Sequence, residues 1–242
     1  MTAPIAATGA SSIVRLERLE LAFAPRPWRF ADERRDEIGR HFAQLRQAKP
    51  ELWNGRMLLL ADHAIDRAVL RGTCFETDFA SFVAWSDWGF PDAGVLNCFA
   101  MGALHSRDGA YLLGVMGPHT VNAGKIYFPA GVPDLGDIVD GSLDLARNVR
   151  REVAEETGLA PGDYEADAGW VCVRTGPRLA MMKRLEASIT ADELRARILA
   201  HLAREPKPEL ADIRIVRGAT DLDAMMPPFV TAYLQHMWSR TP

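Results

Sequence analysis

The segment from Arg151 to Leu159, which reads REVAEETGL, constrains the fold of this chain most, because its charges suit one face of a helix. Its three glutamates occupy positions i, i+3 and i+4, so a helix would place them within about one turn of each other. They are Glu152, Glu155 and Glu156. Like charges this close repel, and Arg151 is available as an i+4 partner for Glu155. A bound divalent cation would offset the remaining charge, since carboxylates are the hard ligands that Mg²⁺ and Mn²⁺ prefer.

The opposite face of the same helix is apolar. Leu145, Val149 and Val153 recur at helical spacing and form a stripe that can anchor the helix on a sheet. We predict a helix from about Leu143 to Glu156. Gly158 suits the left-handed position that follows the last helical residue.

Composition places the chain among ordinary globular proteins. It has 242 residues, of which 48% are hydrophobic and 25% are charged, unlike apolar-poor, highly charged disordered chains. The 28 basic and 32 acidic residues leave a formal net charge of −4, whereas sequence-independent nucleic-acid binding needs a basic surplus. At roughly 100–200 residues per domain, the length predicts one large domain or one domain with an appendage.

Cysteine content and hydropathy favour a cytoplasmic protein. Cys74, Cys98 and Cys172 are far apart and form neither a CxxC pair nor a disulfide framework. No run approaches the ~18 apolar residues of a membrane-spanning helix, and the first residues lack the features of a signal peptide. We therefore expect cytoplasmic localisation, with no membrane contact and no nucleic-acid partner.

Periodicity and turn signals predict an α/β (α+β) chain without regular βαβ alternation, which favours a mixed sheet flanked by helices. Asp108-Gly109 between apolar runs indicates a hairpin, and Thr190 with Glu193 forms a capping box before a helix. The predicted strands are 13–23, 56–61, 64–75, 96–104, 110–116, 126–128, 170–174, 179–185 and 213–216. The predicted helices are 29–49, 78–85, 143–156, 191–203 and 228–238.

The string REVAEETGL, preceded by a strand that ends Tyr-Phe-Pro-Ala-Gly131, resembles the Nudix hydrolase signature. In that signature a glycine-led loop leads to R-E-apolar-x-E-E-x-G-apolar, and every position of this second half is matched here. The resemblance covers about residues 95–240, and it implies a Nudix-type α/β/α sandwich at 95–242. The strands and helix predicted at 12–94 form an N-terminal extension or a small subdomain. Residues 1–11 are small and polar, which predicts a disordered tail.

The resemblance also implies roles for the motif residues. Glu152, Glu155 and Glu156 would bind the catalytic Mg²⁺ or Mn²⁺ ions, bridge a diphosphate and activate the attacking water. Arg151 would tether a carboxylate, and Gly131 and Gly158 would support the loop and the helix end. Family members often add an acidic residue from beyond the helix, and Glu186 is our candidate.

The sequence departs from the signature ahead of the helix. The family places a glutamate eight residues before the arginine, where this chain has Leu143, and Gly131 lies twelve residues before that position. The loop is therefore longer by about six residues than the signature loop. Asp144 or Asp140 is the candidate replacement for the missing glutamate.

Substrate-binding candidates lie in the polar loop before the short strand at 126–128. His119, Asn122 and Tyr127 are the residues of this region that we expect to approach substrate. The aromatic residues of the N-terminal third can stack a base, but a role in the core is favoured for the set. They are Trp53, Trp85, Trp88 and Phe90.

The resemblance implies divalent-metal-dependent hydrolysis of a diphosphate bond in a nucleoside diphosphate linked to another group, such as ADP-ribose, a nucleotide sugar or coenzyme A. The alternative is a Nudix-fold module that senses a nucleotide with little or no catalysis. A third reading, isomerisation of an isoprenoid diphosphate, would need a catalytic cysteine such as Cys98, for which a buried structural role is favoured. The sequence leaves a homodimer open.

Overall fold

A computed structural model describes residues 11–50 and 52–240 of the chain. The predicted disordered tail, 1–11, lies outside the described residues except for Ser11. Among the helices of the described part, none has the length and apolar character needed to cross a bilayer.

Thirteen strands form one mixed sheet whose main path runs β1-β11-β12-β5-β3-β4-β2-β9-β8. β6 joins β5, β7 and β13, and β10 pairs with β12. The strands are β1 (Ser12–Leu16), β2 (Arg18–Phe23), β3 (Arg56–Asp66), β4 (Val69–Asp78), β5 (Val95–His105), β6 (Tyr111–Met116), β7 (Ile126–Tyr127), β8 (Ile138–Val139), β9 (Ser142–Leu143), β10 (Tyr164–Ala166), β11 (Trp170–Thr175), β12 (Arg178–Ala187) and β13 (Leu210–Val216). The expected mixed α+β sheet is thus confirmed.

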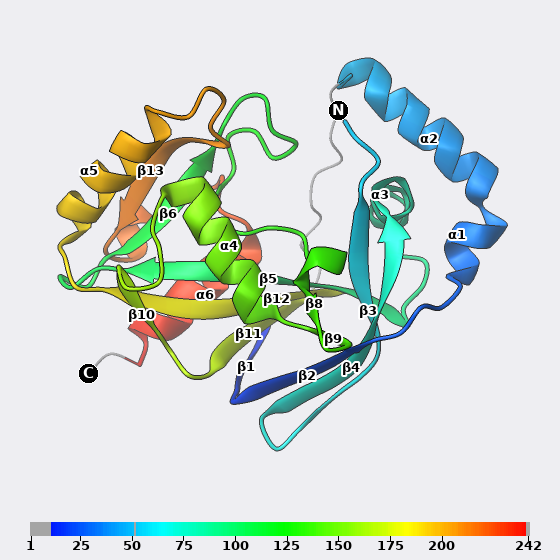
Figure 1. The fold of residues 1–242 in the computed structure, drawn as a ribbon, viewed down its shortest axis with the longest axis horizontal. Helices are drawn as coiled ribbons and strands as arrows, with labels where there is room; N and C mark the ends of the chain where they lie inside the picture. The colour runs from blue at the N-terminus through cyan, green and yellow to red at the C-terminus, as the bar shows by residue number, and fades with distance from the viewer. Residues whose placement is uncertain (1–10, 51, 241–242) are drawn as a thin grey trace.

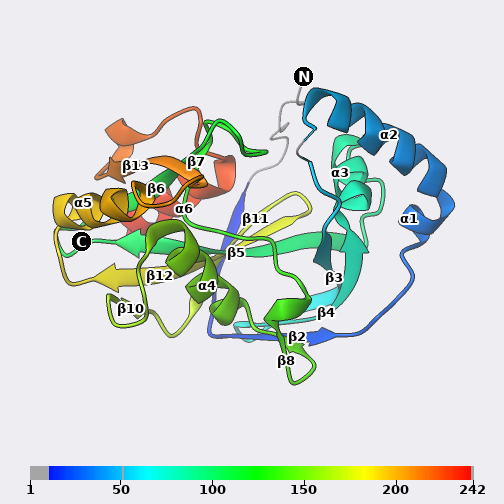
Figure 2. The ribbon, with the colours of Figure 1, turned by 45° about the horizontal axis from the view of Figure 1, so that its top comes forward.

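β5 is the strand that holds the two halves of the molecule together. Nine of its residues, Asn97 to His105, pair in parallel with Arg178 to Glu186 of β12. Its first two residues pair with β3 and its last two pair with β6. In Figures 1 and 2 it therefore runs from the N-terminal half of the molecule into the C-terminal half.

Helices cover both faces of the sheet. α4 and α5 pack on one face and α6 on the other, while α1 to α3 cover the N-terminal strands (Figure 1). Along β5 the side chains alternate, with Cys98 and Ala100 facing the α4 side and Met101 and Ala103 the α6 side. The helices are α1 (Arg29–Glu33), α2 (Arg35–Ala48), α3 (Phe79–Asp87), α4 (Leu145–Thr157), α5 (Ala191–Leu202) and α6 (Pro228–Trp238), with short 3-10 turns η1 (Leu135–Asp137) and η2 (Ala219–Asp221).

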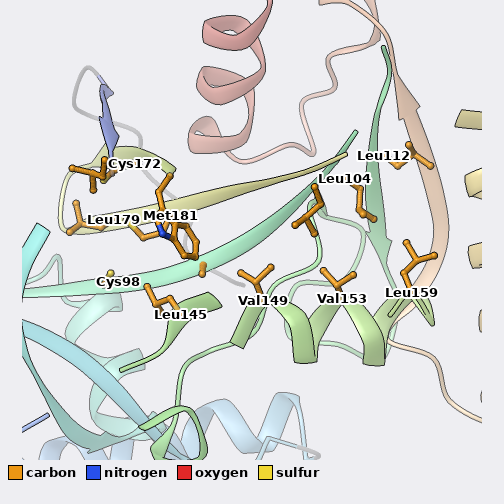
Figure 3. Packing of buried hydrophobic residues seen from close by; sticks show 14 of the residues in the cluster. Cys98, Leu104, Leu112, Leu145, Val149, Val153, Leu159, Cys172, Leu179 and Met181 are labelled. Carbon is orange, nitrogen blue, oxygen red and sulfur yellow. The ribbon is translucent and has the colours of Figure 1, made fainter. Parts of the chain in front are cut away.

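α4 docks on β5 through the predicted apolar stripe. Leu145, Val149 and Val153 are at most 2% exposed, and Figure 3 shows their side chains pointing toward the strands. The helix approaches closely because β5 carries Gly102 at this point, where a Cβ atom would collide with the side chains of Val149 and Val153. This contact fixes which face of α4 turns away from the core.

The structure corrects several predicted boundaries. The single strand expected at 13–23 is broken at Glu17, so that β1 pairs with β11 while β2 pairs with β4. The hairpin in the N-terminal half turns at Arg67-Ala68, not near residue 62, and both turn residues have positive φ (45° and 60°). Neither residue type favours that conformation, so the turn carried no sequence signal.

The proposed division at residues 94 and 95 stays a prediction. β5 begins at Val95, at this division, yet β1 from the N-terminal part joins the sheet of the C-terminal part through its pairing with β11. The N-terminal part is therefore joined to the other by sheet hydrogen bonds.

The packing of α4 leads to a first prediction. Leu145→Asp should destabilise the protein by about 3 kcal/mol or more, because it places a charge among buried apolar side chains. For a chain of this size, thermal unfolding should show a loss of roughly 10 °C in Tm. Arg147→Asp, on the exposed face of the same helix turn, is the matched control. Equal losses in the two variants would show that the stripe does not anchor α4.

Candidate functional site

A long loop connects β7 to α4, the helix whose acidic face forms the candidate site. The chain leaves β7, passes Ala130 and Gly131, and enters α4 at Asp144, whose side chain accepts a hydrogen bond from the backbone N–H of Arg147 (2.9 Å). The helix ends at Gly158 in the left-handed conformation (φ 71°), as predicted. The helix therefore begins two residues later than expected, because Asp144 is its N-cap.

Glu156 lies in the most unusual environment of the three glutamates. It is only 6% exposed, and its Oε1 accepts a hydrogen bond from the backbone N–H of Ala130 (3.2 Å). Its Oε2 is buried and has no hydrogen-bond partner among the described residues. Burial raises the pKa of this carboxyl well above its ordinary value, and the hydrogen bond from Ala130 only partly opposes that effect.

Glu152 faces the same loop one turn earlier. Its carboxylate fills the space beside Gly131, where any Cβ atom would overlap it. Burial raises the pKa of Glu152 to about 7, although the nearby charge of Arg151 lowers it. The charges of Glu155 and Glu209 add to the rise. Glu152 and Glu156 thus form a buried acidic pair that faces the 130–131 turn.

Arg151 is held by a buried acid from the preceding loop. Its Nη2 lies 3.2 Å from Oδ2 of Asp137, whose side chain is 1% exposed, and its Nη1 lies 2.6 Å from Oε1 of Glu152. Asn148 also donates a hydrogen bond to Asp137 Oδ2 (2.9 Å). These contacts orient the guanidinium toward the acidic pair, as the resemblance implied.

Glu155 differs from its two neighbours. Its side chain is 61% exposed and lies 3.5 Å from Arg151 Nη1. All three glutamates share the polar face of α4, as the spacing predicted, but only Glu152 and Glu156 turn toward the loop. Burial therefore distinguishes Glu152 and Glu156 from Glu155 although all three lie within about one turn of the helix.

Asp137 is the residue that the sequence analysis missed. We expected Asp144 or Asp140 to replace the absent signature glutamate, but Asp144 caps the helix and Asp140 occupies an exposed turn with positive φ (49°). Leu143 is buried in the core. Asp137 is one of several aspartates in the loop between β7 and α4, and its ion pair with Arg151 distinguishes it from the others.

The second missed residue is Glu209, which precedes β13. Its charge raises the pKa values of both Glu152 and Glu156, so its carboxylate lies on the acidic side of the site. The predicted fourth acid, Glu186, instead lies on β12 beside His105 Nδ1 (2.9 Å) and Arg184 Nη2 (2.5 Å). No spacing rule connects Glu209 with a helix more than fifty residues earlier.

Two of the predicted substrate residues, His119 and Asn122, lie in the loop between β6 and β7, and the third, Tyr127, lies in β7. Asn122 donates a hydrogen bond to the Tyr127 hydroxyl (3.1 Å). Burial raises the pKa of Tyr127, and the charges of Glu156 and Glu209 add to the rise, so this hydroxyl lies near the acids. His119 packs beside Gly117, whose N–H donates to the Glu209 carbonyl (2.7 Å). Cys98, by contrast, is buried in the core.

The acidic pair suits a divalent cation that is shared with a phosphate. In the described part of the chain, no group of three or more His, Cys, Asp or Glu side chains could hold a metal ion alone. Mg²⁺ usually binds one or two carboxylates and completes its shell with water and substrate phosphates. Glu152 and Glu156, with the unpartnered Oε2 of Glu156, fit that donor set.

Comparison with known proteins finds similarity at the level of structure. No protein-family model matches this sequence, and no curated protein matches it. Similar solved structures include a Nudix hydrolase from Nitrosomonas europaea, with 19% identity, a TM-score of 0.40, and coverage of 61% of this chain and 93% of that one. The Nudix hydrolase RenU from M. smegmatis has 17% identity, a TM-score of 0.38, and coverage of 59% and 82%. The chain is similar to Nudix hydrolases.

A third similar structure is the MutT protein from Methanosarcina mazei. It has 19% identity and a TM-score of 0.38, and the match covers 60% of this chain and 96% of that one.

The raised pKa of Glu152 predicts a pH-dependent stability. Between the ordinary glutamate pKa of 4.5 and about 7, the folded protein binds more protons than the unfolded chain, so the metal-free protein should lose stability as pH rises through this window. Glu152→Gln removes this loss and should be more stable than the parent at pH 8, by on the order of 2 kcal/mol. The difference should disappear near pH 4.5. Urea unfolding at both pH values measures it.

The exposed Glu155 provides the control for this experiment. Glu155→Gln should leave the slope of stability against pH close to that of the parent, because this side chain is mostly in solvent. Equal pH slopes for the parent and Glu152→Gln would contradict the burial of Glu152.

Gly131 gives a separate prediction about geometry. Gly131→Ala should push the Glu152 carboxylate away from the loop, since a Cβ atom would occupy its place. We expect Mn²⁺ binding to weaken by about tenfold, with Tm changed by no more than roughly 4 °C. Titration with Mn²⁺ followed by electron paramagnetic resonance measures the binding. Gly218→Ala, where a Cβ atom meets no neighbour, is the control, and unchanged binding in Gly131→Ala would refute the assignment.

Proposed function

We propose that this protein is a divalent-metal-dependent hydrolase that cleaves a diphosphate bond in a nucleoside diphosphate derivative. The proposal extends to its metal, Mg²⁺ or Mn²⁺, and to a substrate in which a second group is linked to the diphosphate. ADP-ribose, nucleotide sugars and coenzyme A are the compounds of this kind to test first.

The observation that carries this proposal is the buried acidic pair. A carboxylate as buried as Glu156, with one oxygen unpartnered, is costly to ionise, and Glu152 beside it adds a second charge. A fold has no structural reason to keep two such groups side by side on a helix that packs through its other face. A bound divalent cation would offset this cost of ionisation, since it favours the ionised form of both carboxyl groups.

The chain's own residues would position the reacting groups. When bound, the cation would neutralise phosphate charge and lower the pKa of a coordinated water, so that the water loses a proton more readily as it attacks phosphorus. Arg151 forms ion pairs with Asp137 and with Glu152. Through Arg151, the buried Asp137 therefore orients Glu152, the first of the proposed metal ligands. The Ala130 N–H holds Glu156 in the same way.

Glu209 would be the carboxylate best placed to accept the proton from the attacking water. Its charge acts on both Glu152 and Glu156 although it lies outside α4, and it is exposed. A carboxylate that does not coordinate the cation is available to accept that proton. We assign this role to Glu209, because the carboxylate of Glu186, the acid predicted from beyond the helix, is engaged by His105 and Arg184.

The sensing alternative is a protein with the same pocket and no turnover. The missing signature glutamate, where the chain has Leu143, favours it slightly. Asp137 weakens that reason, because it supplies a buried acid to Arg151 from within the longer loop. One measurement, metal-dependent turnover, distinguishes the hydrolase from the sensor.

Phosphate release in a coupled phosphatase assay tests the proposal. The substrates are ADP-ribose, nucleotide sugars, coenzyme A, dinucleoside polyphosphates and nucleoside triphosphates, each with Mg²⁺, Mn²⁺ or EDTA. We expect turnover of one class with metal and none with EDTA. Glu156→Gln should reduce kcat by on the order of 100-fold or more, because it removes a metal ligand.

Glu165→Gln is the matched control, since this glutamate lies exposed on β10. It should keep the parent activity. Glu209→Gln should lower kcat more than it changes KM, because a general base acts on the attacking water and not on substrate binding. If no compound is hydrolysed while nucleotides raise the Tm, the protein is a sensor and the hydrolase proposal is wrong.

A further inference from the structure

Trp53 is an anomaly among the tryptophans of this chain. It is 80% exposed, whereas Trp28, Trp85 and Trp170 are at most 7% exposed and belong to the core. An indole ring is a large apolar surface, and leaving it in water forgoes the free energy that burial would bring. The expected core role thus holds for Trp85 but not for Trp53.

The segment that carries Trp53 is tied to both loops of the candidate site. It links α2 to β3. At its start, Lys49 Nζ donates a hydrogen bond to the Val121 carbonyl (3.1 Å), and beyond its end the Leu58 N–H donates to the Pro133 carbonyl (2.9 Å). Figures 1 and 2 both show the loop between β6 and β7 reaching toward this segment.

These two hydrogen bonds join the Trp53 segment to the two loops that adjoin the acidic pair. Val121 adjoins Asn122, which contacts Tyr127, and Pro133 lies two residues after Gly131, which faces Glu152. Trp53 is five residues from Leu58, a length of chain that spans at most about 17 Å. The Trp53 segment therefore borders the loops of the candidate site.

Other exposed apolar side chains lie on or beside the same loops. Val121 and Val132 are 49% and 48% exposed, and both belong to the tethered loops. Met225, also exposed, accepts a backbone hydrogen bond from Ile126 at the start of β7. The indole ring lies against Gly55, where a Cβ atom would come within 2.8 Å of it, and most of the Trp53 surface is exposed to solvent.

We propose that Trp53 is the platform on which the base of the substrate stacks while its diphosphate reaches the acidic pair. This inference rests on the proposed function and narrows it to substrates that carry an aromatic base. An exposed indole that lies against a glycine suits a base, because stacking needs an accessible π-face. The acidic pair, with its cation bound, would hold the diphosphate.

Intrinsic fluorescence with ADP as the probe tests the platform without relying on turnover. Stacking on Trp53 should quench the emission of the parent protein, and Trp53→Phe should lose that quenching while it keeps most of the affinity. Trp53→Ala should raise the Kd for ADP by about tenfold, which corresponds to about 1.4 kcal/mol. Ile65→Ala, an exposed apolar residue near the β3–β4 turn, should leave both values unchanged.

Kinetics separates this inference from the hydrolase proposal. Trp53→Ala should raise KM for the nucleoside diphosphate substrate with little change in kcat, and should not affect binding of 5-phosphoribosyl pyrophosphate, which has a diphosphate and no base. ADP binding without hydrolysis of any compound would refute the hydrolase and leave the platform intact. Hydrolysis with an unchanged KM in Trp53→Ala would refute the platform and leave the hydrolase intact.

Two further outcomes overturn the inference. One is that the parent protein does not bind ADP at all. The other is that Trp53→Ala changes the molar mass measured by light scattering from that of a dimer to that of a monomer, with ADP affinity unchanged. In that case the exposed indole is a contact between two copies of the chain.

Discussion

The contact of α4 with β5 at Gly102 is the interaction on which the candidate site depends. The absence of a side chain there lets Val149 and Val153 reach the strand, which sets how close the helix lies to the sheet. The same residue donates its N–H to the Pro129 carbonyl (2.9 Å), which holds the start of the loop that faces the glutamates. One position of β5 therefore fixes both the helix that carries the acids and the loop against which they are buried.

That arrangement has an electrostatic consequence. Two carboxylates are placed where water cannot fully solvate them, so both resist ionisation in the absence of a cation. Arg151 offsets part of the cost, and Asp137 keeps the guanidinium in place from the buried side. The buried apolar stripe of α4 contributes the free energy of folding that the acidic face of the helix does not. A metal-binding site requires carboxylates that are poorly solvated and held in place, since a bound cation then stabilises their charges.

The N-terminal part of the chain is built into the site region. β1 extends the sheet beside β11, and β3 binds the loop through the Leu58 N–H. Lys49 holds the other loop. The segment that contains Trp53 lies between these two residues in the chain, so the part that the sequence presented as an extension contacts both loops of the candidate site.

The sequence by itself determined the local features of this protein. The periodicity of α4, its buried stripe, the glutamates on its polar face and the cap at Gly158 follow from contacts within a few residues, and α6 has the predicted bounds for the same reason. Only the tertiary structure decided which acids matter. Asp137 and Glu209 join the site through packing between distant segments, and burial distinguishes Glu156 from Glu155 although the two are adjacent in the chain. Solvation and long-range pairing depend on the whole fold, and no local pattern of residues encodes them.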